Sequence, residues 1–127
     1  MSRVTAPVQR GAFCLSLRAA ARGVAATLRD EPNFRYQLLA ALAVVSLSVW
    51  LRTGTAVVLL CCALVLASEL FNSALERLAD ALYPQRHPLV AAAKDAAAGA
   101  VLTTAAVSVL IGLIVLGPAL YTRLWGP

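Results

Sequence analysis

Residues 69–80 read ELFNSALERLAD and place three carboxylates and an amide inside a stretch that apolar sequence flanks. At about 100° per residue of an α-helix, these polar side chains fall within about 80° of one another around the helix axis. We call this set the polar stripe, and its members are Glu69, Asn72, Glu76 and Asp80. Because an unpaired carboxylate in hydrocarbon is costly, the stripe must face something other than lipid.

The composition places the polar stripe in a membrane protein. Of the 127 residues, 61% are hydrophobic and only 13% are charged, which is too apolar for a soluble domain. The net charge of +5 comes mainly from arginines that are spread along the chain. This pattern favours anchoring at a membrane surface over nucleic-acid binding. The cysteines, Cys14, Cys61 and Cys62, are expected to be small buried packing residues.

Three segments are predicted to span the membrane, within a single membrane domain that covers residues 1–127. They are residues 33–52, 55–82 and 89–121. The uninterrupted apolar run at 56–67 is too short to cross about 30 Å of hydrocarbon. The second span must therefore continue into the polar stripe. Small residues such as Gly99 and Gly112 favour close helix packing within or between subunits.

Residues 1–30 are predicted to form a polar tail and then an amphipathic helix on the membrane surface. Its apolar side chains, such as Phe13 and Leu17, share a face opposite Arg18 and Arg22. Pro32 should then hold the preceding residue, Glu31, in an extended conformation and begin the next helix. Glu31 would lie at the membrane boundary, either as a helix-capping group or as a functional ligand.

The basic residues predict the orientation. Only Arg52 and Arg123 flank the far side of the spans, whereas the other basic residues lie near the N-terminal helix or the loop after the second span. Because positive charge accumulates in cytoplasmic loops, the N-terminus and the polar stripe are predicted to be cytoplasmic. The expected location is the cytoplasmic membrane of a bacterium.

The acidic and basic side chains at this face suit phosphoryl transfer. Carboxylates such as Glu31 and Glu76 are the ligands that Mg²⁺ prefers when it also binds substrate phosphates. Lys94 supplies a positive charge suited to a phosphate, and Asn72 adds a neutral hydrogen-bonding group. Glu69 lies deepest in the stripe, where it could accept a proton from a lipid hydroxyl. The sequence has no GxxxxGK[ST] loop, so the nucleotide site would be of a different kind.

Other interpretations remain open from the residues alone. Asp80 could simply balance a nearby cation (Arg77, Arg86 or Lys94), His87 could be a solvated loop residue, and Lys94 with Asp95 could be a surface pair. A different class of function is a small oligomeric ion transporter or channel that the stripe would line. Against it, the apolar run at 56–67 offers no polar path across the bilayer. A non-catalytic scaffold would leave the carboxylates unexplained.

Three motifs resemble the prokaryotic-type diacylglycerol kinase and undecaprenol kinase family. They are GVAATLRDEPNFR at 23–35, ELFNSALERLAD at 69–80 and HPLVAAAKDAAAGAVL at 87–102. The resemblance implies an all-α integral membrane protein with an N-terminal surface helix and three transmembrane helices. It also implies a homotrimer whose active sites lie between subunits and transfer the γ-phosphate of ATP to a lipid hydroxyl.

The resemblance also implies a role for each matching residue. Glu69 is similar to the general base, and Asn72 to a group that supports the reaction centre. Glu31 and Glu76 resemble ligands of Mg²⁺ and of the nucleotide. Further nucleotide contacts are implied at His87, Lys94 and Asp95, and contacts with the lipid substrate at Arg35, Glu69 and Ala98. The sequence departs from the pattern at Gln37, where an acid is expected, and in lacking clear counterparts of the N-terminal nucleotide-contacting Arg and Tyr.

The sequence also favours one lipid acceptor. The HPL, DAAAGAV and IGLIVLGP segments, the last at 111–118, look closer to the undecaprenol kinase branch. We therefore predict an ATP- and Mg²⁺-dependent kinase that makes undecaprenyl phosphate. Diacylglycerol is the alternative acceptor, because both lipids present a primary hydroxyl at the interface.

Overall fold

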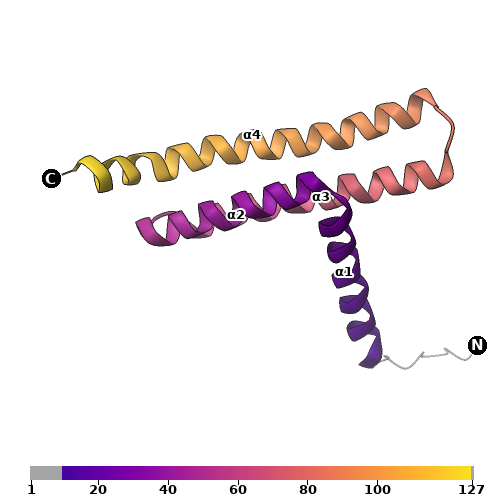
Figure 1. Ribbon diagram of the computed structural model, residues 1–127, viewed down its shortest axis with the longest axis horizontal. Helices are drawn as coiled ribbons and strands as arrows, with labels where there is room; N and C mark the ends of the chain where they lie inside the picture. The colour runs from indigo at the N-terminus through magenta and orange to yellow at the C-terminus, as the bar shows by residue number, and fades with distance from the viewer. Residues whose placement is uncertain (1–9, 127) are drawn as a thin grey trace, which may run out of the picture.

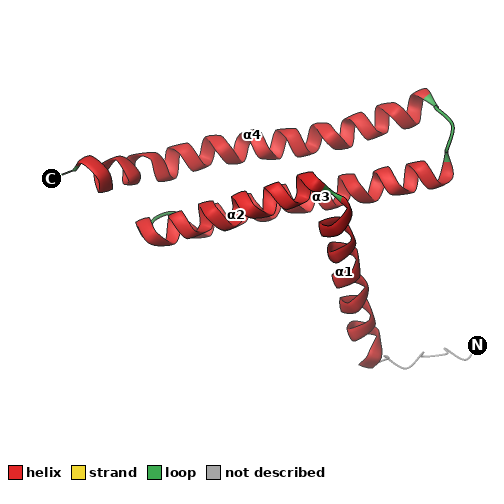
Figure 2. Ribbon diagram, in the orientation of Figure 1, coloured by secondary structure: helices red, strands yellow, loops and turns green. Residues whose placement is uncertain are grey.

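The structure is a computed structural model that describes residues 10–126, and all of its regular structure in that range is helical (Figure 2). The four helices are α1 (Arg10–Asp30), α2 (Pro32–Leu51), α3 (Thr55–Leu82) and α4 (Pro88–Trp125). The last three are long and apolar enough to cross a membrane. The prediction of an N-terminal helix followed by three such helices is therefore confirmed. The predicted polar tail, residues 1–9, lies outside the described residues.

The last three helices run side by side, and α1 stands out at a steep angle from the N-terminal end of α2, while α3 and α4 continue beyond this point (Figure 1). Helix α3 is central, since it packs against both α4 and α2, while α2 and α4 touch less. A polar contact joins α3 to α4 midway along, where the hydroxyls of Ser68 and Thr104 lie 2.9 Å apart. Such hydrogen bonds help to hold helices together where water is absent.

Proline and extended residues set the helix boundaries. Glu31 has φ −109° and ψ 106°, which confirms the extended conformation expected before Pro32. Pro32 and Pro88 then occupy the first positions of α2 and α4, where a missing N–H costs nothing. Because a single residue separates α1 from α2, the chain changes direction sharply at Glu31. We call this junction the elbow.

The elbow is packed rather than loose. Helices α1, α2 and α3 all contact one another, and Arg77 on α3 reaches Asp30 and Glu31 at this junction. Each contributes a side chain that is less than 5% exposed, namely Thr27, Phe34 and Ser73. The elbow therefore holds Glu31 at a fixed place relative to the polar stripe on α3.

The cysteine prediction is correct in part. All three cysteines are free, and Cys61 is buried while Cys62 is partly buried. Cys14 is exposed, contrary to the expectation, because α1 projects away from the other helices and most of its described side chains are exposed.

The turn between α2 and α3 requires glycine. Arg52 ends α2 in the left-handed conformation, with φ 55°, and Gly54 begins α3 with φ 62°. A β-carbon on Gly54 would also collide with the side chain of Val115 on α4. This turn sets which residues of α2 lie opposite which residues of α3.

We expect Gly54→Ala to destabilise the protein by about 1–2 kcal/mol or more, because alanine strains a left-handed conformation and meets Val115. The measurement is the thermal unfolding midpoint in detergent, followed by tryptophan fluorescence. Gly23→Ala is the matched control, since Gly23 lies within helix α1 with no atom near its missing β-carbon. An unchanged midpoint for Gly54→Ala would show that the turn tolerates a side chain.

Candidate functional site

Glu69 is the buried member of the polar stripe. Its exposed fraction is 5%, although it lies within a helix long and apolar enough to cross a membrane. The amide nitrogen of Gln37, on α2, donates a hydrogen bond of 3.2 Å to Glu69 Oε2. Because a buried carboxylate needs a hydrogen-bond donor or a cation, this bond explains how Glu69 is accommodated.

The register of the α2–α3 hairpin brings Gln37 and Glu69 together. The two residues lie on either side of the turn, 16 positions before and 16 positions after Thr53 (53 − 37 and 69 − 53). In an antiparallel helix pair with a short turn, residues equally distant from the turn lie at the same height. Our sequence reasoning noted Gln37 only as a departure from a pattern, and this symmetry is the signal that would have identified it.

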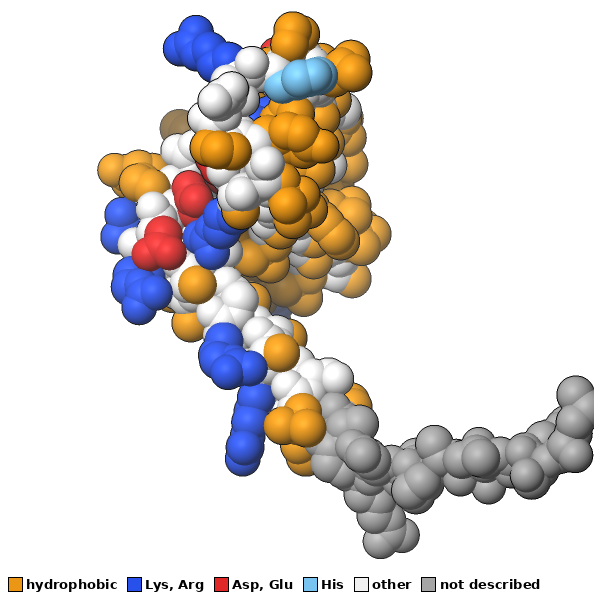
Figure 3. Space-filling model, turned by 90° about the vertical axis from the view of Figure 1, so that its right-hand side faces the viewer, with side chains coloured by type: hydrophobic (Ala, Val, Ile, Leu, Met, Phe, Trp, Pro, Cys, Tyr) orange, Lys and Arg blue, Asp and Glu red, His pale blue; other side chains and the backbone are white. Residues whose placement is uncertain are grey.

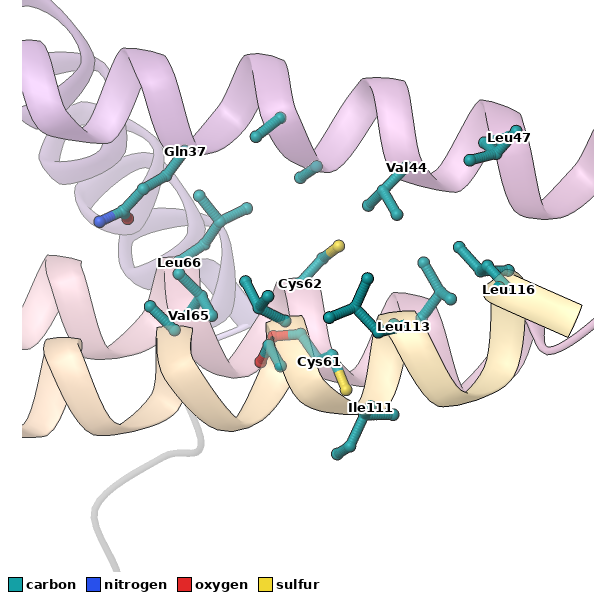
Figure 4. A pocket seen from close by; sticks show the side chains of 18 of the residues that line it. Gln37, Val44, Leu47, Cys61, Cys62, Val65, Leu66, Ile111, Leu113 and Leu116 are labelled. Atoms are coloured by element: carbon teal, nitrogen blue, oxygen red, sulfur yellow. Dashed lines mark hydrogen bonds between the residues drawn. The ribbon is translucent and has the colours of Figure 1, made fainter. Parts of the chain in front are cut away.

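An apolar cavity of about 480 Å³ lies between α2, α3 and α4 (Figure 4). Figure 4 shows Gln37 with a polar side chain at one end of this cavity, while aliphatic residues and the two cysteines line much of the rest. The carbonyl oxygen of Gln37 is buried and has no hydrogen-bond partner among the described residues. The cavity therefore offers an unused hydrogen-bond acceptor next to a buried carboxylate.

Asn72 and Glu76 form the second pair of the stripe. The amide nitrogen of Asn72 donates to Glu76 Oε1 over 3.3 Å, one helical turn along α3. Asn72 Oδ1 is buried without a hydrogen-bond partner among residues 10–126. Carboxylate and amide oxygens such as these suit a hard divalent cation.

Glu31 lies at the elbow and faces α3. Although it occupies the N-cap position of α2, its side chain makes no capping hydrogen bond. The carboxylate instead lies 3.7 Å from the guanidinium of Arg77, which is also 3.6 Å from Asp30. Glu31 thus occupies the capping position without making a capping hydrogen bond, and its interaction with the helix dipole stays a prediction.

Asp80 pairs with Lys94, and this ion pair joins the end of α3 to the start of α4. Lys94 Nζ lies 2.9 Å from Asp80 Oδ1. The interpretation of Asp80 as the partner of a nearby cation is thus confirmed. The alternative surface pair of Lys94 with Asp95 is not formed, since Lys94 faces α3.

His87 serves as the N-cap of α4. Its Nδ1 accepts a hydrogen bond of 3.3 Å from the backbone N–H of Leu89, and its ring lies at a tilt beside Tyr83. His87 is thus exposed in the loop but not merely solvated. Three other predicted site residues are exposed and form no hydrogen bond or ion pair with the stripe among the described residues: Arg35, Asp95 and Ala98.

The charged residues gather at one end of the molecule. Figure 3 looks at that end and shows acidic and basic side chains together where the α1 arm meets the bundle, while hydrophobic side chains cover the neighbouring surface. Among residues 10–126, three or more His, Cys, Asp or Glu side chains do not meet in one cluster. A metal held here would therefore need oxygen atoms from a bound ligand as well as those of the protein.

At the opposite end of the molecule, an arginine lies against a tryptophan ring. The guanidinium of Arg123, near the end of α4, lies 5.3 Å from the ring centre of Trp50 on α2. Tryptophan and arginine are typical anchors at a membrane–water boundary. The two ends thus differ, one holding the carboxylates and the other an aromatic–arginine pair.

Comparison with known proteins identifies the family. Residues 18–116 match the family described as prokaryotic diacylglycerol kinase. The chain is 39% identical to an undecaprenol kinase of Bacillus subtilis over 116 aligned positions, in an alignment that covers 85% of this chain and 90% of that protein. It is 37% identical to a diacylglycerol kinase of Synechocystis sp. over 110 residues, 84% of this chain and 63% of that protein. With a match that covers most of its length and all of the polar stripe, the chain belongs to the prokaryotic diacylglycerol kinase family.

Proposed function

We propose that this protein is a membrane lipid kinase that transfers the γ-phosphate of ATP to the primary hydroxyl of undecaprenol. The observation that carries this proposal is the buried carboxylate of Glu69, which accepts a hydrogen bond from Gln37, a residue that lines an apolar cavity. A lipid alcohol combines a hydrocarbon chain with one hydroxyl, and this arrangement offers a place for each. The family, whose members include lipid kinases, supports the same reaction.

Glu69 acts as the general base. It takes the proton from the lipid hydroxyl while the hydroxyl oxygen attacks the γ-phosphorus, and the bond from that phosphorus to the bridging oxygen of ADP breaks. Gln37 orients the Glu69 carboxylate through its amide nitrogen. Asn72 supports the reaction centre through its bond to Glu76.

Glu31 and Glu76 are the proposed ligands of Mg²⁺, which would neutralise the phosphates of ATP when bound. Their carboxylate oxygens and the unpartnered Oδ1 of Asn72 fit a hard cation. The proposed nucleotide contacts lie on or next to the first turns of α4. They are His87, Lys94 and Asp95. Arg35 and Ala98 are the proposed further contacts with the lipid.

The active form is proposed to be a homotrimer with sites between subunits. Large hydrophobic side chains are exposed along all three of the long helices, so these surfaces must meet either lipid or another subunit. Of the proposed site residues on α4, Asp95 and Ala98 form no hydrogen bond or ion pair with the stripe within the described chain. A neighbouring subunit would bring such residues to it.

The protein is proposed to lie in the bacterial cytoplasmic membrane with the stripe on the cytoplasmic side. The elbow, the Asp80–Lys94 pair and the α1 arm share one end of the bundle, and basic residues are concentrated there. The opposite end holds Arg52 and the Trp50–Arg123 contact. Because cytoplasmic loops carry an excess of Lys and Arg, this uneven distribution of basic residues supports a cytoplasmic position for the stripe.

Diacylglycerol is the second candidate acceptor, because the Synechocystis relative is a diacylglycerol kinase. In a competition assay with Mg²⁺ and labelled ATP, vesicles that contain equal amounts of undecaprenol and dioleoylglycerol should yield mainly labelled undecaprenyl phosphate. If phosphatidic acid is the main labelled product, the acceptor is diacylglycerol and not undecaprenol. If neither lipid is labelled and Glu69-dependent ion flux appears without ATP, the protein is a transporter and the kinase proposal is wrong.

Glu69→Gln should lower the turnover number by about 10²- to 10⁴-fold, because the amide cannot take the hydroxyl proton. Binding of a non-hydrolysable ATP analogue and the oligomeric state, measured by gel filtration in detergent, should stay as in the wild type. Near-normal turnover in this variant would rule out Glu69 as the base.

Gln37→Leu should lower the turnover number by about tenfold, because the Glu69 carboxylate loses the hydrogen bond that orients it. The KM for ATP should not change, since Gln37 lies at the lipid-facing cavity. Ser46→Ala is the matched control on the same helix, because the Ser46 hydroxyl bonds only to the backbone of its own helix. Equal turnover for the Gln37 variant and the control would contradict the orienting role.

A further inference from the structure

Arg77 makes a loose ionic contact at the elbow. Its Nη2 atom lies 3.6 Å from Asp30 Oδ2 and 3.7 Å from Glu31 Oε1. Both distances exceed the roughly 2.7–2.9 Å of a charge-assisted hydrogen bond between a guanidinium and a carboxylate. The side chain of Arg77 is 40% exposed. The guanidinium is therefore attracted to both carboxylates without being fixed by either.

The elbow does not need Arg77 to hold its shape. Exposed ion pairs of this kind contribute little to stability. The elbow is already packed by the buried side chains of Thr27, Phe34 and Ser73. A purely structural role therefore accounts poorly for a cation at this place.

The position of Arg77 fits a ligand with phosphate groups. Its guanidinium lies 3.7 Å from Glu31, one of the two proposed Mg²⁺ ligands, and it follows the other, Glu76, in the sequence of α3. Lys94, the other cation proposed to contact the nucleotide, lies 2.9 Å from Asp80. A guanidinium has five N–H donors in a planar fork that matches phosphate oxygens, and the ion pairs of Arg77 involve only one of its nitrogens.

We propose that Arg77 binds a phosphate group of the nucleotide, and that its contact with Asp30 and Glu31 is the arrangement of the nucleotide-free protein. This inference rests on the proposed kinase function. A cation bound to Glu31 would lie close to the guanidinium of Arg77. The two would repel each other because both are positively charged. Arg77 is then displaced from Glu31 toward the phosphates that the same cation binds.

The test compares two substitutions that break the same ion pair from opposite sides. Arg77→Met should weaken binding of a non-hydrolysable ATP analogue, measured by equilibrium dialysis with Mg²⁺ in detergent, by about tenfold or more. The KM for ATP should rise by a similar factor, whereas the KM for the lipid should not change. Asp30→Asn should leave binding unchanged or tighten it, since it removes a carboxylate that competes for Arg77.

Two further variants complete the comparison. Arg77→Lys keeps the charge but loses the fork, so it should bind the analogue with an affinity between those of the wild type and Arg77→Met. Arg86→Met is the matched control, because Arg86 is an exposed arginine in the loop after α3 and should behave as the wild type. Helix content and gel filtration confirm that each variant is folded.

The outcomes separate this inference from the proposed function. If Arg77→Met and Asp30→Asn weaken analogue binding equally, Arg77 only fastens the elbow and the inference is wrong. It is also wrong if Arg77→Met binds the analogue as the wild type does while the wild type phosphorylates lipid. A wild-type protein that neither binds the analogue nor phosphorylates either lipid would instead overturn the kinase proposal.

Discussion

A carboxylate that lies between membrane-length helices must find a hydrogen-bond donor or a cation, and the rest of this structure depends on how that requirement is met. Glu69 meets it through Gln37, a residue on the preceding helix. The pairing exists only because the turn at residues 52–54 fixes the register of the hairpin. The left-handed backbone conformations of Arg52 and Gly54, which lie outside the site, thus allow Gln37 to orient Glu69.

The helices could largely be predicted from the sequence, because each follows from a strong local signal. Long apolar runs define α2, α3 and α4, and Pro32 and Pro88 mark where two of them begin. The carboxylates of the stripe could also be found, since their spacing on one helix needs no tertiary information. A polar group in an apolar run is conspicuous in any membrane sequence.

The partners of the carboxylates were harder to predict from the sequence, because they depend on how the helices are placed in space. Lys94 pairs with Asp80 across the α3–α4 connection rather than with Asp95 beside it. Arg77 reaches Glu31 only because the elbow turns α1 and α2 toward α3. Both contacts join residues on different helices, and the sequence alone offered three possible cations for Asp80 without choosing among them.

The length of α2 has a consequence for the surrounding bilayer. Its 20 residues span about 30 Å, close to the thickness of the hydrocarbon layer. Trp50 lies near one end of α2, and the packed elbow fixes the other. The length of α2 therefore matches one thickness of the hydrocarbon layer. In a thicker or thinner membrane, the helix must tilt or the bilayer must deform. Lipid composition would in this way set the depth at which Glu69 meets the headgroup region, independently of any change in the protein.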